Sequence, residues 1–202
     1  GSVYYNSIVT LGTGSGLYFK QRLVPFGEYV PLEHWLRGII DFFDLPTSHM
    51  SWGPTNQDLL RIGHLRLAPF VCYEIVYPGL VAHDSRNAHF IINISNDSWF
   101  GHSIGPLQHF QIARMRALEN GRYLLRGTNN GVTAIVDHRG RIIERAEQFT
   151  RSVLRGEARP MQGNTPFSSL GSAPVLIICL ALLAANIYRT ARDTSDDRTA
   201  SE

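Results

Sequence analysis

The sequence predicts a layered α/β fold followed by one hydrophobic helix near the C-terminus. Two observations predict the layers: strand-like and helix-like segments alternate, and several strands are uniformly apolar, as in sheets buried on both faces. A change of composition after Pro166 predicts the final helix. With 202 residues, of which 44% are hydrophobic and 18% charged, the chain is long enough to form one domain with a real core.

The N-terminal part is expected to form a hairpin. Residues 3–10 alternate and are rich in β-branched side chains, residues 12–16 are a glycine-rich turn, and 17–23 read as a second strand. A dinucleotide-binding loop would need a helix after the glycines, so the pattern favours a hairpin over a phosphate site. Prolines bound a loop at 24–31, and apolar spacing then predicts a short helix over 32–43.

The central part is expected to supply the apolar strands. After a polar loop at 45–58, a hairpin leads into a strand at 65–72, which Cys72 to Ile75 should close, and Pro78 opens a helix. The apolar run 88–95 predicts a strand buried on both faces. Further strands are expected at 123–126, 132–136 and 141–144.

The clearest helical pattern covers 106–120. Its spacing predicts two faces. The inward face should hold Phe110, Ala113, Ala117 and Leu118, and the outward face Arg114 and Arg116.

Residues 167–188 form an apolar segment whose length matches the roughly 20 residues that cross a bilayer. A buried C-terminal helix is the alternative. We therefore predict a folded domain at 1–165, a transmembrane helix at 166–189 and a polar, disordered tail at 190–202. No secretory signal opens the chain, which starts directly on a strand-like segment.

Charge and residue usage narrow the function. The net charge is +2 and the charges are scattered, which argues against a nucleic-acid partner. The basic residues are 18 arginines and one lysine, Lys20. Only lysine offers a compact ammonium that can lose its proton, so Lys20 is a candidate functional residue. The eight histidines show no ligand spacing, so we expect no metal and no cofactor.

Cys72 ends an apolar strand and precedes a helix, which is where open α/β sheets place reactive groups. On position alone, a free cysteine is more often a small buried residue, and the two cysteines, Cys72 and Cys179, do not suggest a disulfide framework. A cysteine nucleophile needs a base and a pocket for the oxyanion. A glutamate could supply the base. Lys20 and the backbone N–H of Tyr73 could supply the pocket for the oxyanion.

Each of these residues has a plainer alternative. Lys20 would then be a solvated strand residue, and Glu28 would form a salt bridge with Arg22. Trp99 and Phe100 are either core residues or an exposed hydrophobic lip, and their glycine-containing loop favours the lip. The turn at 129–131 and His109 are expected to be structural.

Five segments carry a family resemblance. The strand Phe70-Val71-Cys72-Tyr73-Glu74 resembles the nucleophile strand of the nitrilase (carbon-nitrogen hydrolase) superfamily. Segments 18–31, 94–101, 105–119 and 128–131 resemble, more narrowly, the apolipoprotein N-acyltransferase family. The resemblance spans residues 3 to about 165, and the terminal apolar segment is similar to that family's last membrane helix.

The resemblance implies a nitrilase-like α-β-β-α sandwich, present here in part, and a Glu-Lys-Cys active site. Cys72 would be the nucleophile, Lys20 the oxyanion stabiliser and Glu28 a second essential glutamate. Tyr73 and Glu74 match further residues required for activity.

The reaction it implies moves an acyl chain from a phospholipid, through a thioester, to the N-terminal amine of a diacylglyceryl-cysteine lipoprotein. It also implies a multi-pass protein of the bacterial inner membrane, with its catalytic domain on the periplasmic side.

One departure from the family pattern concerns the general base. In the superfamily this glutamate lies on an earlier strand, and neither Glu28 nor Glu74 matches it. We therefore expect the chain to be inactive in isolation. Two rival functions remain: a soluble carbon-nitrogen hydrolase of the same superfamily, and a catalytically dead, membrane-tethered binding module.

Overall fold

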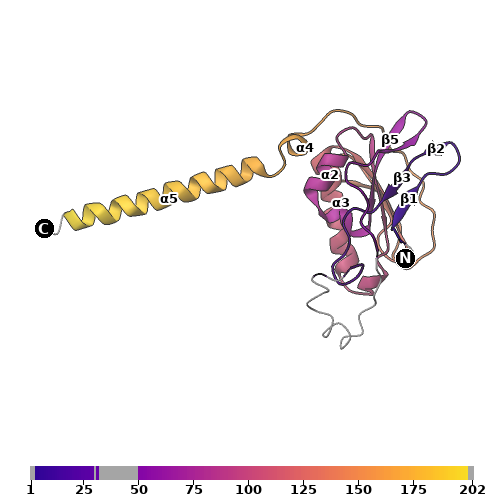
Figure 1. The fold of residues 1–202 in the computed structure, drawn as a ribbon, viewed down its shortest axis with the longest axis horizontal. Helices are drawn as coiled ribbons and strands as arrows, with labels where there is room; N and C mark the ends of the chain where they lie inside the picture. Colours follow the sequence, from indigo (N-terminus) through magenta and orange to yellow (C-terminus); the bar gives the residue numbers. More distant parts are fainter. Residues whose placement is uncertain (1–2, 30, 32–49, 200–202) are drawn as a thin grey trace.

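The computed structural model describes residues 3–29, 31 and 50–199. The helix expected over 32–43 lies outside these residues. Within them the predicted α/β class is confirmed: a mixed sheet carries helices on one face, and a long helix extends away from this body (Figure 1).

A seven-stranded sheet forms the centre of the molecule, in the order β2-β4-β5-β6-β7-β8-β9. The three central strands, β5, β6 and β7, run parallel, and the outer pairs are antiparallel. The strands are β2 (Gly14–Ser15), β4 (Leu60–Ile62), β5 (Leu65–Val71), β6 (Phe90–Ser95), β7 (Tyr123–Thr128), β8 (Ala134–Val136) and β9 (Ile142–Arg145).

The predicted N-terminal hairpin is confirmed. Strands β1 (Ser7–Val9) and β3 (Leu17–Phe19) pair antiparallel with Ile8 opposite Tyr18. Both are shorter than expected because the glycine-rich turn between them leaves the hairpin and pairs with β4 as β2. No helix follows the glycines, so the phosphate-loop alternative does not apply here.

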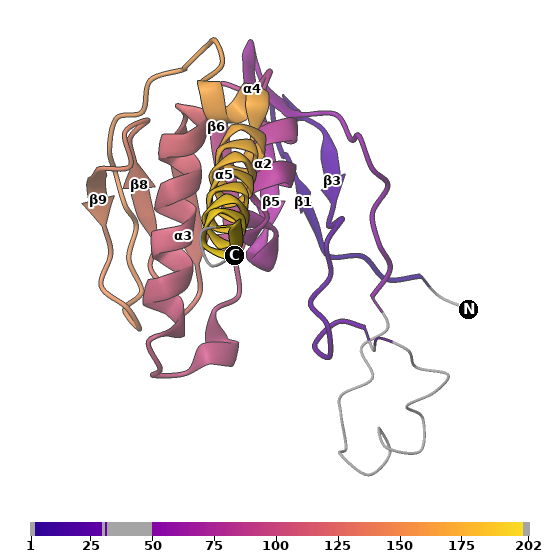
Figure 2. The ribbon, with the colours of Figure 1, turned by 90° about the vertical axis from the view of Figure 1, so that its left-hand side faces the viewer.

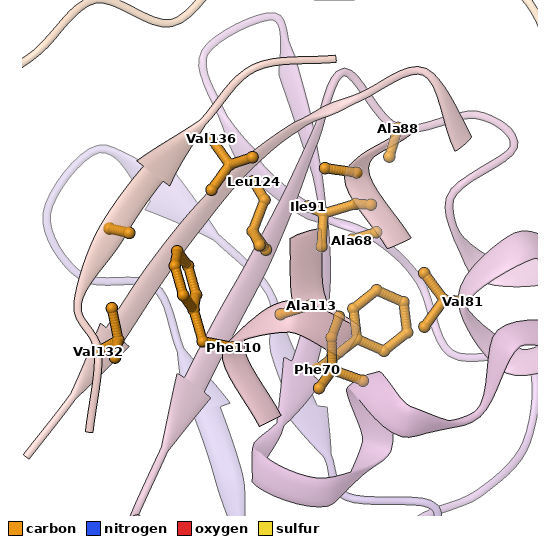
Figure 3. Close-up of a cluster of buried hydrophobic side chains, with 13 residues drawn as sticks. Ala68, Phe70, Val81, Ala88, Ile91, Phe110, Ala113, Leu124, Val132 and Val136 are labelled. Atoms are coloured by element: carbon orange, nitrogen blue, oxygen red, sulfur yellow. The ribbon is translucent and has the colours of Figure 1, made fainter. Parts of the chain in front are cut away.

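Helices α2 (Pro78–Asp84) and α3 (Gly105–Asn120) cover one face of the sheet (Figure 2). The main core lies between them and the sheet (Figure 3). Its central row joins three parallel strands through Ala68, Ile91 and Leu124, which are side by side in the strand register. A smaller apolar cluster around Tyr18, Leu67 and Phe90 fills part of the opposite face.

The expected faces of α3 are partly wrong. Phe110, Ala113 and Ala117 are buried as predicted, but Leu118 is 45% exposed and Arg116 only 9%. Successive residues of a helix are 100° apart around its axis. The buried side of α3, which contacts α2, α4 and the sheet, includes positions 116 and 117. Leu118 therefore lies on the outer side, and Arg116 is buried beside Glu119, with 3.2 Å between Nε and Oε2.

The C-terminal part begins with a short helix, α4 (Pro166–Leu170), and continues, after Gly171, as α5 (Ala173–Thr199). A helix with a window long and apolar enough to span a membrane runs over Ala173–Thr190, and none of that window is buried, which disfavours the buried-helix alternative. The apolar helix thus starts later than the predicted 166, because α4 packs on α2 and α3.

The predicted disordered tail is helical up to Thr199. A helix already nucleated extends at little cost, and this tail contains no proline or glycine to stop it. The division into 1–165, 166–189 and 190–202 otherwise stays a prediction.

Candidate active site

Cys72 lies at the edge of the sheet where the three parallel strands end. Strand β5 ends at Val71, so the expectation that residues 72–75 close the strand is wrong. Cys72 instead has a φ of 52° and starts a 3-10 helix, η1 (Cys72–Val76). A non-glycine residue rarely adopts this conformation, which turns the chain sharply at the strand end. The thiol is half-buried, with Sγ 3.9 Å from the carbonyl oxygen of Asn96.

Lys20 is buried and bound to Glu28. Its side chain is only 1% exposed, and Nζ donates to Oε2 of Glu28 at 2.7 Å. The backbone N–H of Val24 also donates to this oxygen, at 2.8 Å, and Asn6 donates to the other. The structure thus differs from both plainer alternatives. Lys20 is not solvated, and Glu28 pairs with Lys20 and not with Arg22, which lies over the ring of Tyr77.

Glu74 connects the lysine segment to the cysteine turn. Its Oε1 accepts the N–H groups of Gln21 and Arg22, at 2.6 and 3.1 Å, and the hydroxyl of Tyr18 at 3.0 Å. Its Oε2 accepts the N–H of Val71 at 2.7 Å. The backbone donors are Gln21 and Arg22, which directly follow Lys20, and Val71, which directly precedes Cys72. One buried carboxylate thus holds both backbones at a common point.

Burial raises the pKa of Glu74, against the N–H groups of Val71, Arg22 and Gln21, which lower it. Burial and the charge of Glu74 raise the pKa of Tyr18, so its hydroxyl keeps the proton it donates. Both oxygens of Glu74 thus have donors inside the fold. This arrangement suits a carboxylate that holds the backbones of both segments in place.

A second buried polar cluster lies on the other side of Cys72, and sequence reasoning missed it. Arg126 donates to Asp97 Oδ2 at 2.9 Å and also to Asn93. Asp97 Oδ1 accepts the hydroxyl of Ser95 at 2.6 Å and faces Nδ1 of His109 at 3.1 Å. The alternation of side chains between the two faces of a strand could have indicated this cluster. Asn93 and Arg126 lie on the same face as Ile91 and Leu124, two positions earlier, which are core residues.

The charges of this cluster support one another. Burial alone would raise the pKa of Asp97, but hydrogen bonds from His109 and Ser95, with the charge of Arg126, lower it below its usual value. Burial lowers the pKa of Arg126, and the charges of Asp97 and then Cys72 oppose that effect. Asp97 and Arg126 thus form a buried ion pair.

The loop after β6 exposes aromatic side chains beside the site. Trp99 is 71% exposed and Phe100 37%, both in the 3-10 helix η2 (Ser98–Phe100). Asn129, expected only as part of a turn, holds this loop by donating to Asn96 Oδ1 at 2.6 Å and Ser98 Oγ at 2.9 Å. Tyr73, next to the thiol, packs edge-on against Tyr77, with ring centroids 5.6 Å apart.

No group of three or more His, Cys, Asp or Glu that could hold a metal occurs among residues 3–29, 31 and 50–199. A polar cavity of about 450 Å³ lies apart from the cysteine turn, and no predicted site residue lines it. Its walls include Asp58, Arg61, Arg66, His83 and Asp84.

The family model for carbon-nitrogen hydrolases matches residues 1–160. The apolipoprotein N-acyltransferase of Pseudomonas syringae pv. tomato is 54% identical over 192 residues, covering 93% of this chain and 38% of the relative. That of Azotobacter vinelandii is 54% identical over 186 residues, covering 92% and 36%. Among solved structures, a carbon-nitrogen hydrolase from Helicobacter pylori G27 has a TM-score of 0.48 and 16% identity, covering 66% of this chain and 48% of its own.

This chain therefore spans a little over a third of the length of these curated relatives. The resemblance to apolipoprotein N-acyltransferases noted in the sequence is confirmed, and the family match extends over most of the chain. The chain belongs to the carbon-nitrogen hydrolase family.

Proposed function

We propose that the whole protein is an N-acyltransferase that carries an acyl chain on Cys72, from a phospholipid to the N-terminal amine of a diacylglyceryl-cysteine lipoprotein. The observation that carries this proposal is the 54% identity to apolipoprotein N-acyltransferases over nearly the whole chain. The arrangement of Cys72, Lys20 and Glu28 is consistent with it.

In the first step the thiolate of Cys72 attacks an ester carbonyl of the phospholipid. The C–O bond breaks, the acyl chain remains on sulfur as a thioester, and the lysophospholipid leaves with a proton. The tetrahedral intermediate carries an oxyanion, which we assign to the ammonium of Lys20 and the N–H of Tyr73. Glu28, at 2.7 Å from Lys20 Nζ, holds this buried side chain in position.

In the second step the α-amine of the lipoprotein attacks the thioester. An amide C–N bond forms, the C–S bond breaks, and Cys72 is released as the thiolate while the amine loses a proton. A thioester suits this transfer because it yields readily to an amine.

We infer that the general base comes from a part of the protein outside this chain. Glu74 has both oxygens bound by donors within the fold, and Glu28 is paired with Lys20. Neither carboxylate is held against the thiol, whose hydrogen-bond partner is the carbonyl oxygen of Asn96. The chain on its own is expected to be inactive.

The membrane supplies the acyl donor in this proposal. Helix α5 has the length and composition of a membrane span, and Trp99 and Phe100 form an exposed aromatic lip beside the site. We propose that this lip receives acyl chains. By the family resemblance, the protein resides in the bacterial inner membrane as a multi-pass protein, with the catalytic domain on the periplasmic side.

The test is the intact mass of the full-length protein after incubation with phospholipid in detergent. We expect a mass increase of one acyl group, located on Cys72 by peptide mapping and released by an amine-bearing diacylglyceryl peptide as the N-acyl product. Cys72→Ala should carry no adduct.

Two results would point to the rival functions. An adduct that forms and is lost to water, with no amide product, would indicate a hydrolase. A folded protein that forms no adduct with any phospholipid would indicate a binding module and would overturn the transferase proposal.

A further inference from the structure

We propose that Arg126 is a positioning residue for Cys72, which it holds through Asn93 and Asp97, and that its charge favours the thiolate form of Cys72. The inference deepens the proposed function, since it takes Cys72 as the nucleophile. It concerns a buried residue of β7 that is absent from the motifs around the cysteine.

The strand register brings Arg126 to the site. Phe70 on β5 is opposite Asn93 on β6, and Asn93 is opposite Arg126 on β7. This row lies two residues further along the strands than the apolar row of the core. It is on the same face of the sheet, the face that the helices cover. Two polar side chains therefore occupy the last core layer before the edge of the sheet that carries Cys72.

Arg126 reaches the backbone of Cys72 through Asn93. One guanidinium nitrogen donates to Asn93 Oδ1, which orients the amide of this fully buried side chain. Its Nδ2 then donates to the carbonyls of Phe70, at 3.0 Å, and Cys72, at 3.4 Å. These two carbonyls flank the bend at which Cys72 has its positive φ. The chain of hydrogen bonds thus supports a conformation that is otherwise unfavourable.

Arg126 reaches the thiol side through Asp97. Its second terminal nitrogen donates to Asp97 Oδ2 at 2.9 Å, and the backbone N–H of Asp97 donates to Asn129 Oδ1 at 3.1 Å. Asp97 directly follows Asn96, whose carbonyl oxygen is the acceptor 3.9 Å from Cys72 Sγ. The same guanidinium therefore fixes both the turn that carries the thiol and the loop that faces it.

The charge of the cluster bears on the thiol. The groups packed around Arg126 that can titrate are Asp97, His109 and Cys72, and Glu74 lies beyond the cysteine turn. The charge of Cys72 counts among the influences that raise the pKa of Arg126. A cation held beside a cysteine favours its thiolate form, and Arg126 is held beside the cysteine turn through Asn93.

The test measures how fast iodoacetamide alkylates Cys72 in the full-length protein as a function of pH, by peptide mass spectrometry. Arg126→Gln should raise the pH midpoint of alkylation by about one unit or more, because a cation is lost. Asp97→Asn should lower the midpoint, because Arg126 then lacks its counter-charge. Both changes loosen the same cluster, so a purely structural role would not move the midpoint in opposite directions.

Arg122→Gln is the matched control. Arg122 is also a buried arginine, and it directly precedes β7 at the opposite end from Arg126. Its removal should leave the midpoint unchanged. Because alkylation needs no lipid, this test remains valid even if no acyl adduct ever forms.

The proposal is overturned if Arg126→Gln leaves the midpoint in place, or if both variants shift it the same way. Should Arg126→Gln not accumulate as folded protein, Asp97→Asn decides: a lower midpoint supports the proposal, and an unchanged or higher one overturns it. Arg126→Lys should restore the midpoint while acyl transfer stays reduced, because lysine keeps the charge without the two-sided geometry.

Discussion

At the scale of single residues, the cysteine edge of the sheet depends on a close contact between Gly131 and Asp97. A Cβ on Gly131 would overlap Oδ2 of Asp97 and lie 2.6 Å from its Cγ. The carboxylate cannot move aside, since Arg126, Ser95 and His109 hold both of its oxygens. The absence of a side chain at 131 therefore lets the loop after β7 close over the ion pair.

Gly131→Ala should accordingly destabilise the protein by about 1–3 kcal/mol and slow alkylation of Cys72, because the carboxylate must leave its partners. The measurement is the melting temperature in detergent, with alkylation as the second readout. Gly79→Ala is the control: a Cβ there has no neighbour within 4 Å, and alanine should favour helix α2 by about 0.5–1 kcal/mol. Equal melting temperatures for the two variants would refute the steric argument.

The same residues explain how far the sequence could predict the site. A family motif predicts Cys72, Lys20 and Glu28, and the structure shows Lys20 and Glu28 in contact. The Arg126–Asp97 pair was missed because its members are 29 residues apart and join only when β6 and β7 align. Local sequence patterns do not encode such pairing. An arginine inside an apolar strand therefore gives no indication of its partner.

At the scale of elements, the positions of most strands were predictable because each apolar run is a local signal. The prediction failed where two elements share a boundary. Residues 72–75 have strand-like side chains, yet the hydrogen bonds to Glu74 and Asn93 bend the chain into η1. On α3, the burial of Arg116 depends on α4, which comes about 50 residues later and contacts the same helix.

Helix α4 is attached to the domain by Arg122. This buried guanidinium donates to five backbone carbonyls and so joins the segment before α4 to the start of the central strands. Thr165 adds a bond to the carbonyl of Glu119. The acceptors of Arg122 are Arg86, Ala88, Asn120, Gly121 and Gly163.

Arg122→Gln should therefore free the segment that leads to α4. Losing these charge-assisted bonds costs about 1–3 kcal/mol of local stability, so trypsin should cleave after the exposed Arg155 about tenfold faster. Cleavage is followed by mass spectrometry under native conditions. Arg139→Gln, in the exposed turn before β9, is the control and should cleave at the original rate. Unchanged cleavage in Arg122→Gln would show that α4 is held by other contacts.

At the scale of the whole molecule, the sheet domain and α5 differ in where their apolar side chains lie. The domain has a buried apolar core, whereas α5 extends away from it with its apolar side chains exposed along the length of the helix (Figure 1). The exposed residues include Val175, Ile178, Leu182 and Ile187. A helix with this much uncovered apolar surface is stable in a lipid environment and would be a liability in water.

If α5 crosses the membrane, a charge at its middle should prevent insertion and the same charge at its end should not. Leu180→Arg places a guanidinium near the centre of the span, at a cost of about 2.5–3.5 kcal/mol, whereas Thr190→Arg places it at the last residue, from which it can reach the interface. The measurement is the inserted fraction of residues 166–192 within a reporter protein that is modified only when the segment crosses the membrane. We expect the inserted-to-excluded ratio to fall about a hundredfold for Leu180→Arg and to stay near the original for Thr190→Arg. Full insertion of both variants, or of neither, would contradict the assignment of α5 as a membrane span. The loop around Trp99 would then be the remaining observation that supports contact with lipid.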